Sequence, residues 1–163
     1  MSSLTIIDGN ILDAQEEYIL QQCCCTAVKP HGLSEVIAIK WKDCNVYSER
    51  RKIGNRNLAV VEDRPKPGTI KVVGERKVIC AFAQYAMGKS GRYDSFNIPD
   101  TPNDRYNYFK ECLDKIVLLN PKSIAIPYKI GCGLAGGDWN KYSSTISEFA
   151  QKYQQIKIVI YKL

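Results

Sequence analysis

Histidine, paired cysteines and long apolar runs are scarce in this chain, and each scarcity excludes a class of function. His31 is the only histidine, and the seven cysteines are scattered or adjacent rather than paired at turn spacing. The sequence therefore lacks the ligand pattern of a zinc site, and we expect neither a metal nor another cofactor. No apolar run approaches the roughly 20 residues that cross a bilayer, so we expect no membrane partner.

The bulk composition is that of a globular protein of ordinary size. The chain has 163 residues, of which 45% are hydrophobic and 25% charged, and this predicts one domain over residues 1–163. The first residues lack the basic start and apolar centre of a signal peptide, so we expect the protein in the cytoplasm or the nucleus. We also expect it to be a monomer. The net charge of +6 suits a polyanionic ligand. A nucleic-acid partner is less favoured, because the basic residues are spread along the chain.

The most informative stretch is a glycine-rich loop. Residues 130–139 read IGCGLAGGDW, between an apolar run at 123–126 and a run with helical spacing that starts at Trp139. Glycine lets the backbone adopt positive φ and approach a ligand closely, while free N–H groups at a helix start favour negative charge. The pattern predicts a phosphate-binding loop, with a nucleotide diphosphate as the first candidate ligand. The alternative is a tight connection in which Asp138 or Asn140 caps the helix.

Strand-like and helix-like runs alternate along the chain. Strands are predicted at 4–7, 18–28, 58–61, 69–73, 77–82, 123–126 and 156–161, and helical stripes at 33–41, 106–117 and 139–153. Asn103 or Asp104 would cap the middle helix. We expect an α/β fold, a three-layer α/β/α sandwich around a mixed, largely parallel sheet. Ligands in such folds bind where loops leave the strands, here at residues 26–33 and 127–138.

Three adjacent cysteines lie in the second predicted strand. If residues 18–28 form a strand, Cys23, Cys24 and Cys25 alternate between its two faces. This argues against disulfides among them, and we expect reduced thiols that pack in the core.

Two common phosphate-binding motifs do not fit. Residues 131–136 match the pattern G-x-G-x-x-G, but a dinucleotide-binding unit also needs a second strand with an acidic residue about 20 positions further on. No Asp or Glu lies between Phe149 and Leu163. A P-loop is excluded because no Gly-Lys-Ser or Gly-Lys-Thr follows the glycines at the required spacing.

The stretch IPYKIGCGLAGGDW at 126–139 resembles the second ligand loop of macrodomains, in the branch related to ADP-ribose 1″-phosphate phosphatases and terminal ADP-ribose-glutamate hydrolases. IDGNIL at 7–12, FAQY at 82–85 and the last six residues are similar to other parts of that branch. The resemblance implies an α/β/α fold that binds ADP-ribose or an ADP-ribosylated protein in a cleft. The adenine would lie near residues 8–11, the diphosphate on 131–136, and the distal ribose between that loop and 26–33.

The ligand-binding residues expected from this resemblance and from the position of the loops are Gly9, Asn10, Ile11, Thr26, His31, Gly32, Leu33, Gln84, Tyr128, Gly131, Cys132, Gly133, Leu134, Ala135 and Gly136. The chain departs from the macrodomain pattern at three positions. Asn10 stands where many members carry an Asp that binds the adenine, although its carbonyl oxygen still accepts a hydrogen bond. Thr26 stands near an expected asparagine. Ala135 stands where the glutamate-deconjugating enzymes carry a catalytic Asp, so that role is not transferred.

Two side chains are catalytic candidates for a hydrolysis at the distal ribose. His31 lies in the first of the two loops and is the only imidazole available for proton transfer. Asp138 is the other candidate, although a helix cap is the simpler explanation of that residue. Cys132 lies near a helix start, where a thiolate is stabilised, but no base is visible beside it and a packed thiol is favoured.

Three functions stay open on the sequence. The first is a hydrolase that removes phosphate from ADP-ribose 1″-phosphate, or ADP-ribose from modified protein or nucleic acid, and His31 favours it. The second is a reader that binds ADP-ribose without turnover, which the departures at Thr26 and Ala135 favour. The third and least favoured is a basic RNA-binding domain, which would show a steep dependence on salt.

Overall fold

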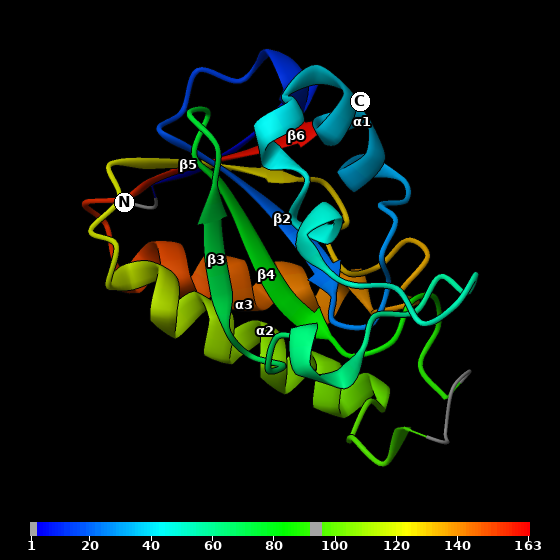
Figure 1. Cartoon of the computed structure of the whole chain (residues 1–163). Coiled ribbons are helices and arrows are strands. Elements are labelled where there is room, and N and C mark those ends of the chain that lie inside the picture. Colours follow the sequence, from blue (N-terminus) through cyan, green and yellow to red (C-terminus); the bar gives the residue numbers. More distant parts are fainter. Residues whose placement is uncertain (1–2, 92–95) are drawn as a thin grey trace.

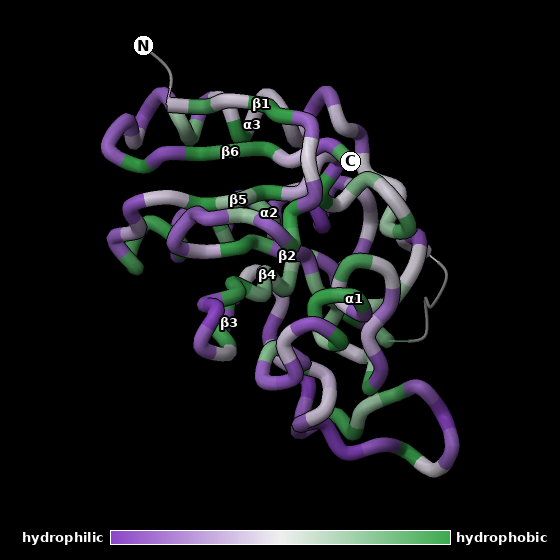
Figure 2. The backbone as a smooth tube through the Cα atoms, turned by 90° about the horizontal axis from the view of Figure 1, so that it is seen from above, coloured by the Kyte–Doolittle hydropathy of each residue, from purple (hydrophilic) through white to green (hydrophobic). Residues whose placement is uncertain are grey.

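A six-stranded sheet forms the centre of the computed structural model, which describes residues 3–91 and 96–163. The strands are β1 (Leu4–Asp8), β2 (Tyr18–Cys24), β3 (Ile70–Val73), β4 (Val78–Gln84), β5 (Ser123–Pro127) and β6 (Lys157–Lys162). Their order across the sheet is β1-β6-β5-β2-β4-β3, as Figure 2 shows. β3 is antiparallel to β4, and the other described pairings are parallel, so the sheet is mixed and largely parallel.

Helices cover both faces of this sheet. α2 (Pro102–Val117) and α3 (Trp139–Lys152) lie on one face, and α1 (Leu33–Lys40) lies on the other (Figure 1). In the described part of the chain, short 3-10 helices lie in the connections: η1 (Ile11–Asp13), η2 (Lys42–Cys44), η3 (Val46–Glu49) and η4 (Val61–Asp63). Each face has its own apolar core, built around Phe109 and Ile146 on the α2 and α3 side and around Ile37 and Phe82 on the α1 side. The predicted three-layer α/β/α sandwich is confirmed. None of the described helices is long and apolar enough to cross a membrane.

The strand β2 ends earlier than the sequence predicts. It stops at Cys24 rather than near residue 28, and its register with β4 shifts between Gln22 and Cys24. Because of this irregularity, Cys23, Cys24 and Cys25 do not alternate between faces, and all three pack in the core on the α1 side. All three are free and buried, and burial raises the pKa of each thiol.

The start of α2 also differs from the prediction. Thr101, not Asn103 or Asp104, is the N-cap, and Pro102 takes the first helical position. The Thr101 hydroxyl accepts a hydrogen bond from the Asp104 N–H over 3.0 Å, and the Asp104 carboxylate accepts one from the Thr101 N–H over 3.0 Å. This reciprocal pair satisfies two N–H groups at once, which a cap at Asn103 or Asp104 would not do.

The strand predicted at 58–61 is absent among the described residues. Lys52 and Ala59 form an isolated bridge, and η4 begins at Val61. The Ala59 N–H instead donates to the carbonyl oxygen of Thr26 over 2.7 Å. The apolar character of this segment therefore reflects packing under the loop that follows β2, not membership of the sheet.

Candidate ligand-binding site

A cavity of about 600 Å³ lies at the edge of the sheet where the neighbouring strands β2, β4 and β5 end. Residues 25–32, which connect β2 to α1 and are called the first loop here, form one wall. Residues 128–138, which connect β5 to α3 and are called the glycine-rich loop, form the facing wall. The cavity is lined by Gln21, Gln22, Cys24, Lys29, His31, Gly32, Leu33, Ser34, Tyr47, Gln84, Met87, Gly88, Pro127, Tyr128, Lys129, Ile130, Gly131, Gly133, Leu134 and Ala135. The two loops expected from the sequence thus share one space, because β2 and β5 are adjacent.

The glycine-rich loop keeps part of its backbone free for a ligand. Its turns use the N–H groups of Cys132, Gly136 and Gly137, which donate to carbonyl oxygens inside the loop over 2.9 to 3.1 Å. Within the described residues, the N–H groups of Gly131, Gly133, Leu134 and Ala135 have no acceptor. All four of these residues line the cavity. The loop is therefore folded on itself and still offers several donors to an anion.

The first loop adds donors from the start of a helix. Gly32 is the N-cap of α1, and its φ of 56° and ψ of −128° form a conformation that only glycine adopts readily. The N–H groups of Gly32, Leu33 and Ser34 have no acceptor among residues 3–91 and 96–163. They belong to the first turn of α1, where the helix dipole favours negative charge. Both walls of the cavity therefore offer backbone hydrogen-bond donors, which favour a negatively charged ligand.

The charged lining of the cavity is basic. Lys29, His31 and Lys129 line it, and no Asp or Glu is found among its described lining residues. Lys129 has a φ of 63°, which is unusual for a residue with a side chain. The two nearest thiols are poor nucleophiles, because burial raises the pKa of Cys24, and burial together with Asp138 raises the pKa of Cys132 to about 11.

Two glutamines form the floor between β2 and β4. Gln22 donates from Nε2 to Gln84 Oε1 over 2.8 Å, and Gln84 donates from Nε2 to the Ala86 carbonyl oxygen over 2.9 Å. This relay fixes the orientation of both amides. Gln22 Oε1 is buried without a hydrogen-bond partner in the described part of the chain. A Cβ atom on Gly131 would lie 2.8 Å from this oxygen, so Gly131 closes directly over it.

The structure brings together many of the residues expected from the sequence and leaves others outside. Those that line the cavity are His31, Gly32, Leu33, Gln84, Tyr128, Gly131, Gly133, Leu134 and Ala135. Those that do not line it are Gly9, Asn10, Ile11, Thr26, Cys132, Gly136 and Asp138. The first group comes from the first loop and the start of α1, from the end of β4 and from the glycine-rich loop.

The residues outside the cavity have other contacts. Asn10 caps η1, because its side-chain oxygen accepts a hydrogen bond from the Leu12 N–H over 3.0 Å. Thr26 is fully buried, and its hydroxyl has no partner in the described residues. Asp138 is the N-cap of α3 and accepts a hydrogen bond from the Asn140 N–H over 3.0 Å. Of the two caps that the sequence offered for α3, Asp138 is therefore the correct one.

Sequence reasoning missed part of the lining. Gln21 and Gln22 were not proposed as site residues, although two adjacent polar side chains inside an apolar strand are a usable signal. Gln21 is buried and accepts a hydrogen bond from the Ser34 hydroxyl over 2.8 Å, which ties β2 to α1. Among the described residues, no group of three or more His, Cys, Asp or Glu side chains is placed to hold a metal ion.

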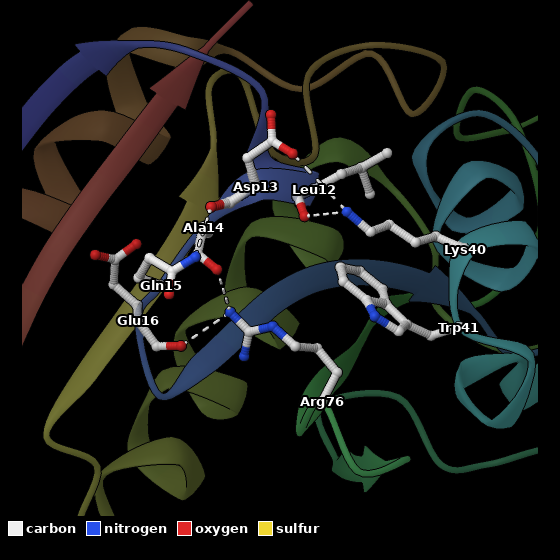
Figure 3. A pocket seen from close by; sticks show the side chains of 8 residues that line it. All are labelled: Leu12, Asp13, Ala14, Gln15, Glu16, Lys40, Trp41 and Arg76. Atoms are coloured by element: carbon white, nitrogen blue, oxygen red, sulfur yellow. Dashed lines mark hydrogen bonds and ion pairs between the residues drawn. The ribbon is translucent and has the colours of Figure 1, made fainter.

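A second hollow of about 390 Å³ lies between the segment after η1 and the end of α1 (Figure 3). Its two cations are already bound to backbone oxygens. Arg76 donates to the carbonyl oxygens of Ala14 and Glu16 over 2.9 Å each, and Lys40 donates to that of Leu12 over 2.8 Å. This hollow contains none of the expected ligand-binding residues, and we do not assign it as the site.

The fold has counterparts among solved structures. The macrodomain of Thermus aquaticus DarG is 18% identical, with a TM-score of 0.70 over 98% of both chains. The macrodomain of Mycobacterium tuberculosis DarG is 18% identical, with a TM-score of 0.68 over 98% of this chain and 97% of that one. A Trypanosoma brucei macrodomain solved with ADP-ribose is 10% identical, with a TM-score of 0.62 over 98% of this chain and 62% of that one. No model of a protein family and no curated protein matches the chain. The chain has the macrodomain fold.

Proposed function

From this macrodomain fold, we propose that the protein binds ADP-ribose or one of its derivatives in the cavity between the first loop and the glycine-rich loop. One observation carries the proposal: two strand-to-helix loops with unpaired N–H groups face each other across the cavity. The described residues that line this cavity include basic side chains but neither Asp nor Glu. A diphosphate is the ligand that such donors favour. The similar Trypanosoma brucei macrodomain, solved with ADP-ribose, supports the same ligand.

The volume and the lining also favour a ligand longer than a free diphosphate. A cavity of about 600 Å³ lies within the range of small-molecule sites. The glycine-rich loop would hold the diphosphate, and the space between Gly32 and Gln84 would accept the distal ribose. Tyr128, whose ring packs against that of Trp139 with centroids 5.0 Å apart, gives the cavity a rigid aromatic edge.

Calorimetric titration with ADP-ribose, ADP and AMP tests the binding proposal. We expect ADP-ribose to bind tightest, ADP more weakly and AMP weakest, because each truncation removes contacts with one part of the cavity. Equal affinities for all three ligands would contradict a distal-ribose subsite. Absence of ADP-ribose binding would overturn the proposed function.

We further propose that the bound ligand is hydrolysed at its distal end. With ADP-ribose 1″-phosphate, the oxygen of a water molecule would bond to phosphorus, and the bond from phosphorus to the ribose oxygen would break. A proton from the water would pass to that ribose oxygen, giving inorganic phosphate and ADP-ribose. The free N–H groups of both loops would stabilise the negative charge that develops. His31 supports this proposal as the imidazole in the lining.

A reader that binds without turnover is the second candidate. The basic lining favours it, because hydrolysis of a glycosidic or ester bond usually relies on a carboxylate or another general base. Incubation with ADP-ribose 1″-phosphate and with an ADP-ribosylated protein separates the two candidates. Released phosphate or released ADP-ribose would select a hydrolase, and tight binding without either product would select the reader.

A further inference from the structure

Asn57, which is not part of the first loop, binds the backbone of that loop through its side chain. It lies between η3 and η4, and its side-chain oxygen Oδ1 accepts hydrogen bonds from the N–H groups of Val28, over 2.8 Å, and Lys29, over 3.0 Å. These partners are 29 and 28 positions away in the chain. This contact therefore fixes the backbone of the first loop at Val28 and Lys29.

The same contact fixes which way the amide of Asn57 points. An oxygen that accepts two backbone N–H groups cannot be exchanged with the amide nitrogen, because the nitrogen has no acceptor capacity. The nitrogen Nδ2 therefore faces Nε2 of His31, 3.3 Å away, and the sulfur of Met87, 3.7 Å away. Both of these atoms act as acceptors.

The tautomer of the uncharged His31 ring follows from this arrangement. A neutral imidazole has one donor and one acceptor nitrogen, and the hydrogen bond at one nitrogen sets the role of the other. Because Asn57 Nδ2 only donates, Nε2 of His31 accepts and carries no proton. The proton then lies on Nδ1.

We propose that Asn57 is a positioning residue of the ligand site: it selects, for the uncharged ring of His31, the tautomer with the proton on Nδ1. The ring then offers the ligand a hydrogen-bond donor, as Lys29 and the N–H groups of α1 do on the same wall. Its partner is an oxygen of a phosphate or of a ribose hydroxyl, and this part rests on the proposed function. The lone pair of His31 Nε2 accepts the hydrogen bond from Asn57, so Nε2 can remove a proton from water only after that hydrogen bond breaks.

The alternative is that Asn57 only braces the loop, while His31 exchanges between tautomers. Two substitutions separate these possibilities. Asn57→Asp keeps an oxygen for the N–H groups of Val28 and Lys29, but it presents a second acceptor to Nε2 and should reverse the tautomer. Asn57→Ala removes both contacts. Asn55→Ala serves as the control, because Asn55 is exposed in the same connection.

The experiment is a long-range proton–nitrogen spectrum of ¹⁵N-labelled protein without ligand at pH 9, well above the usual histidine pKa of about 6.5. His31 is the only histidine, so its two ring nitrogens are assigned without ambiguity. We expect a protonated Nδ1 and an unprotonated Nε2 in the wild type and in Asn55→Ala, and the reverse in Asn57→Asp. A protonated Nε2 in the wild type, or an unchanged tautomer in Asn57→Asp, would overturn the proposal.

Titration of the same sample with ADP-ribose tests the role of the tautomer in binding. We expect the Nδ1 signal to shift while Nε2 stays unprotonated, and Asn57→Asp to weaken ADP-ribose binding by about tenfold or more. Asn55→Ala should leave the affinity within about twofold. If ADP-ribose does not bind at all, the proposed function fails while the tautomer result on the free protein stands. If it binds and the His31 signals do not move, His31 is not a ligand donor.

Discussion

Arg105 in α2 donates a hydrogen bond over 3.2 Å to the carbonyl oxygen of Ala135 in the glycine-rich loop. The same guanidinium donates to the carbonyl oxygens of Gly88, over 2.6 Å, and Ala86, over 3.1 Å. It also forms a two-pronged pair with the carboxylate of Asp100, over 3.0 and 2.8 Å. Arg105 is 2% exposed. One buried side chain thus connects the glycine-rich loop to the loop after β4, and both loops line the cavity.

Replacing Arg105 by methionine should destabilise the protein strongly. The substitution leaves the Asp100 carboxylate, which is mostly buried, without its cation. It also leaves the carbonyl oxygens of Gly88 and Ala135 without a donor, while that of Ala86 keeps its hydrogen bond from Gln84. We expect the free energy of unfolding to fall by about 3–5 kcal/mol, measured by urea denaturation. Arg105→Lys should also destabilise, because an ammonium group cannot reproduce the planar set of donors. Lys110→Met, on the exposed side of α2, is the control and should change stability by less than about 1 kcal/mol. Wild-type stability of Arg105→Met would contradict this account.

Two glycines of the same loop should respond differently to alanine. At Gly131, φ is +74°, and a Cβ atom would lie 2.8 Å from Gln22 Oε1 and 2.9 Å from the Tyr142 ring. Gly131→Ala should therefore lower the free energy of unfolding by at least about 2 kcal/mol. At Gly133 a Cβ atom meets nothing within 4 Å, so Gly133→Ala should change stability by no more than about 0.5 kcal/mol. Urea denaturation of both variants checks this pair, and equal effects would show that the loop is not held as described.

The role of Asp138 can be separated into capping and chemistry. Asparagine caps helices as well as aspartate does but has no carboxylate, so Asp138→Asn should keep stability within a few tenths of a kcal/mol. Asp138→Ala removes the acceptor of the Asn140 N–H and should lower the free energy of unfolding by about 1 kcal/mol. Any phosphate release measured for the wild type should persist in Asp138→Asn. Loss of release with unchanged stability would instead make Asp138 a catalytic residue.

The thiol of Cys132 should react slowly at neutral pH. Burial and the nearby Asp138 raise its pKa to about 11, so little thiolate is present at pH 7. Because the thiolate is the reactive form, the rate of alkylation by iodoacetamide should rise about tenfold for each pH unit from 7 to 10. Mass spectrometry of the folded protein measures the rate, and Cys132→Ser identifies the site, since the other six cysteines are buried. Fast labelling at pH 7 would show that this thiol is activated.

Local patterns in the sequence were enough to find most elements and the glycine-rich loop. The apolar run at 123–126 is β5, and the helical stripe from Trp139 is α3, capped by Asp138. The errors have specific causes. β2 ends at Cys24 because its register with β4 shifts there, and the apolar segment 58–61 packs under the first loop instead of joining the sheet. A local pattern shows neither the register of β2 against β4 nor the contact between Ala59 and Thr26.

The contacts that shape the candidate site were not accessible from the sequence. Asn57 reaches Val28 and Lys29 from the connection before η4. Arg105, which lies 30 positions before Ala135 in the chain, reaches it from α2. Both are single polar residues without a motif. Nothing in their neighbours indicates that they bind a distant loop, because such contacts depend on which strands are adjacent.

The amino-acid order alone determined that strands and helices alternate, that the strands are covered on both faces, and that glycines concentrate between 131 and 137. These properties follow from side-chain period and backbone freedom, which act over a few residues. Tertiary structure decided that the loops after β2 and β5 face each other, which N–H groups stay free, and which nitrogen of His31 faces Asn57. These depend on strand order and on groups brought together from distant positions, and no local rule contains that information.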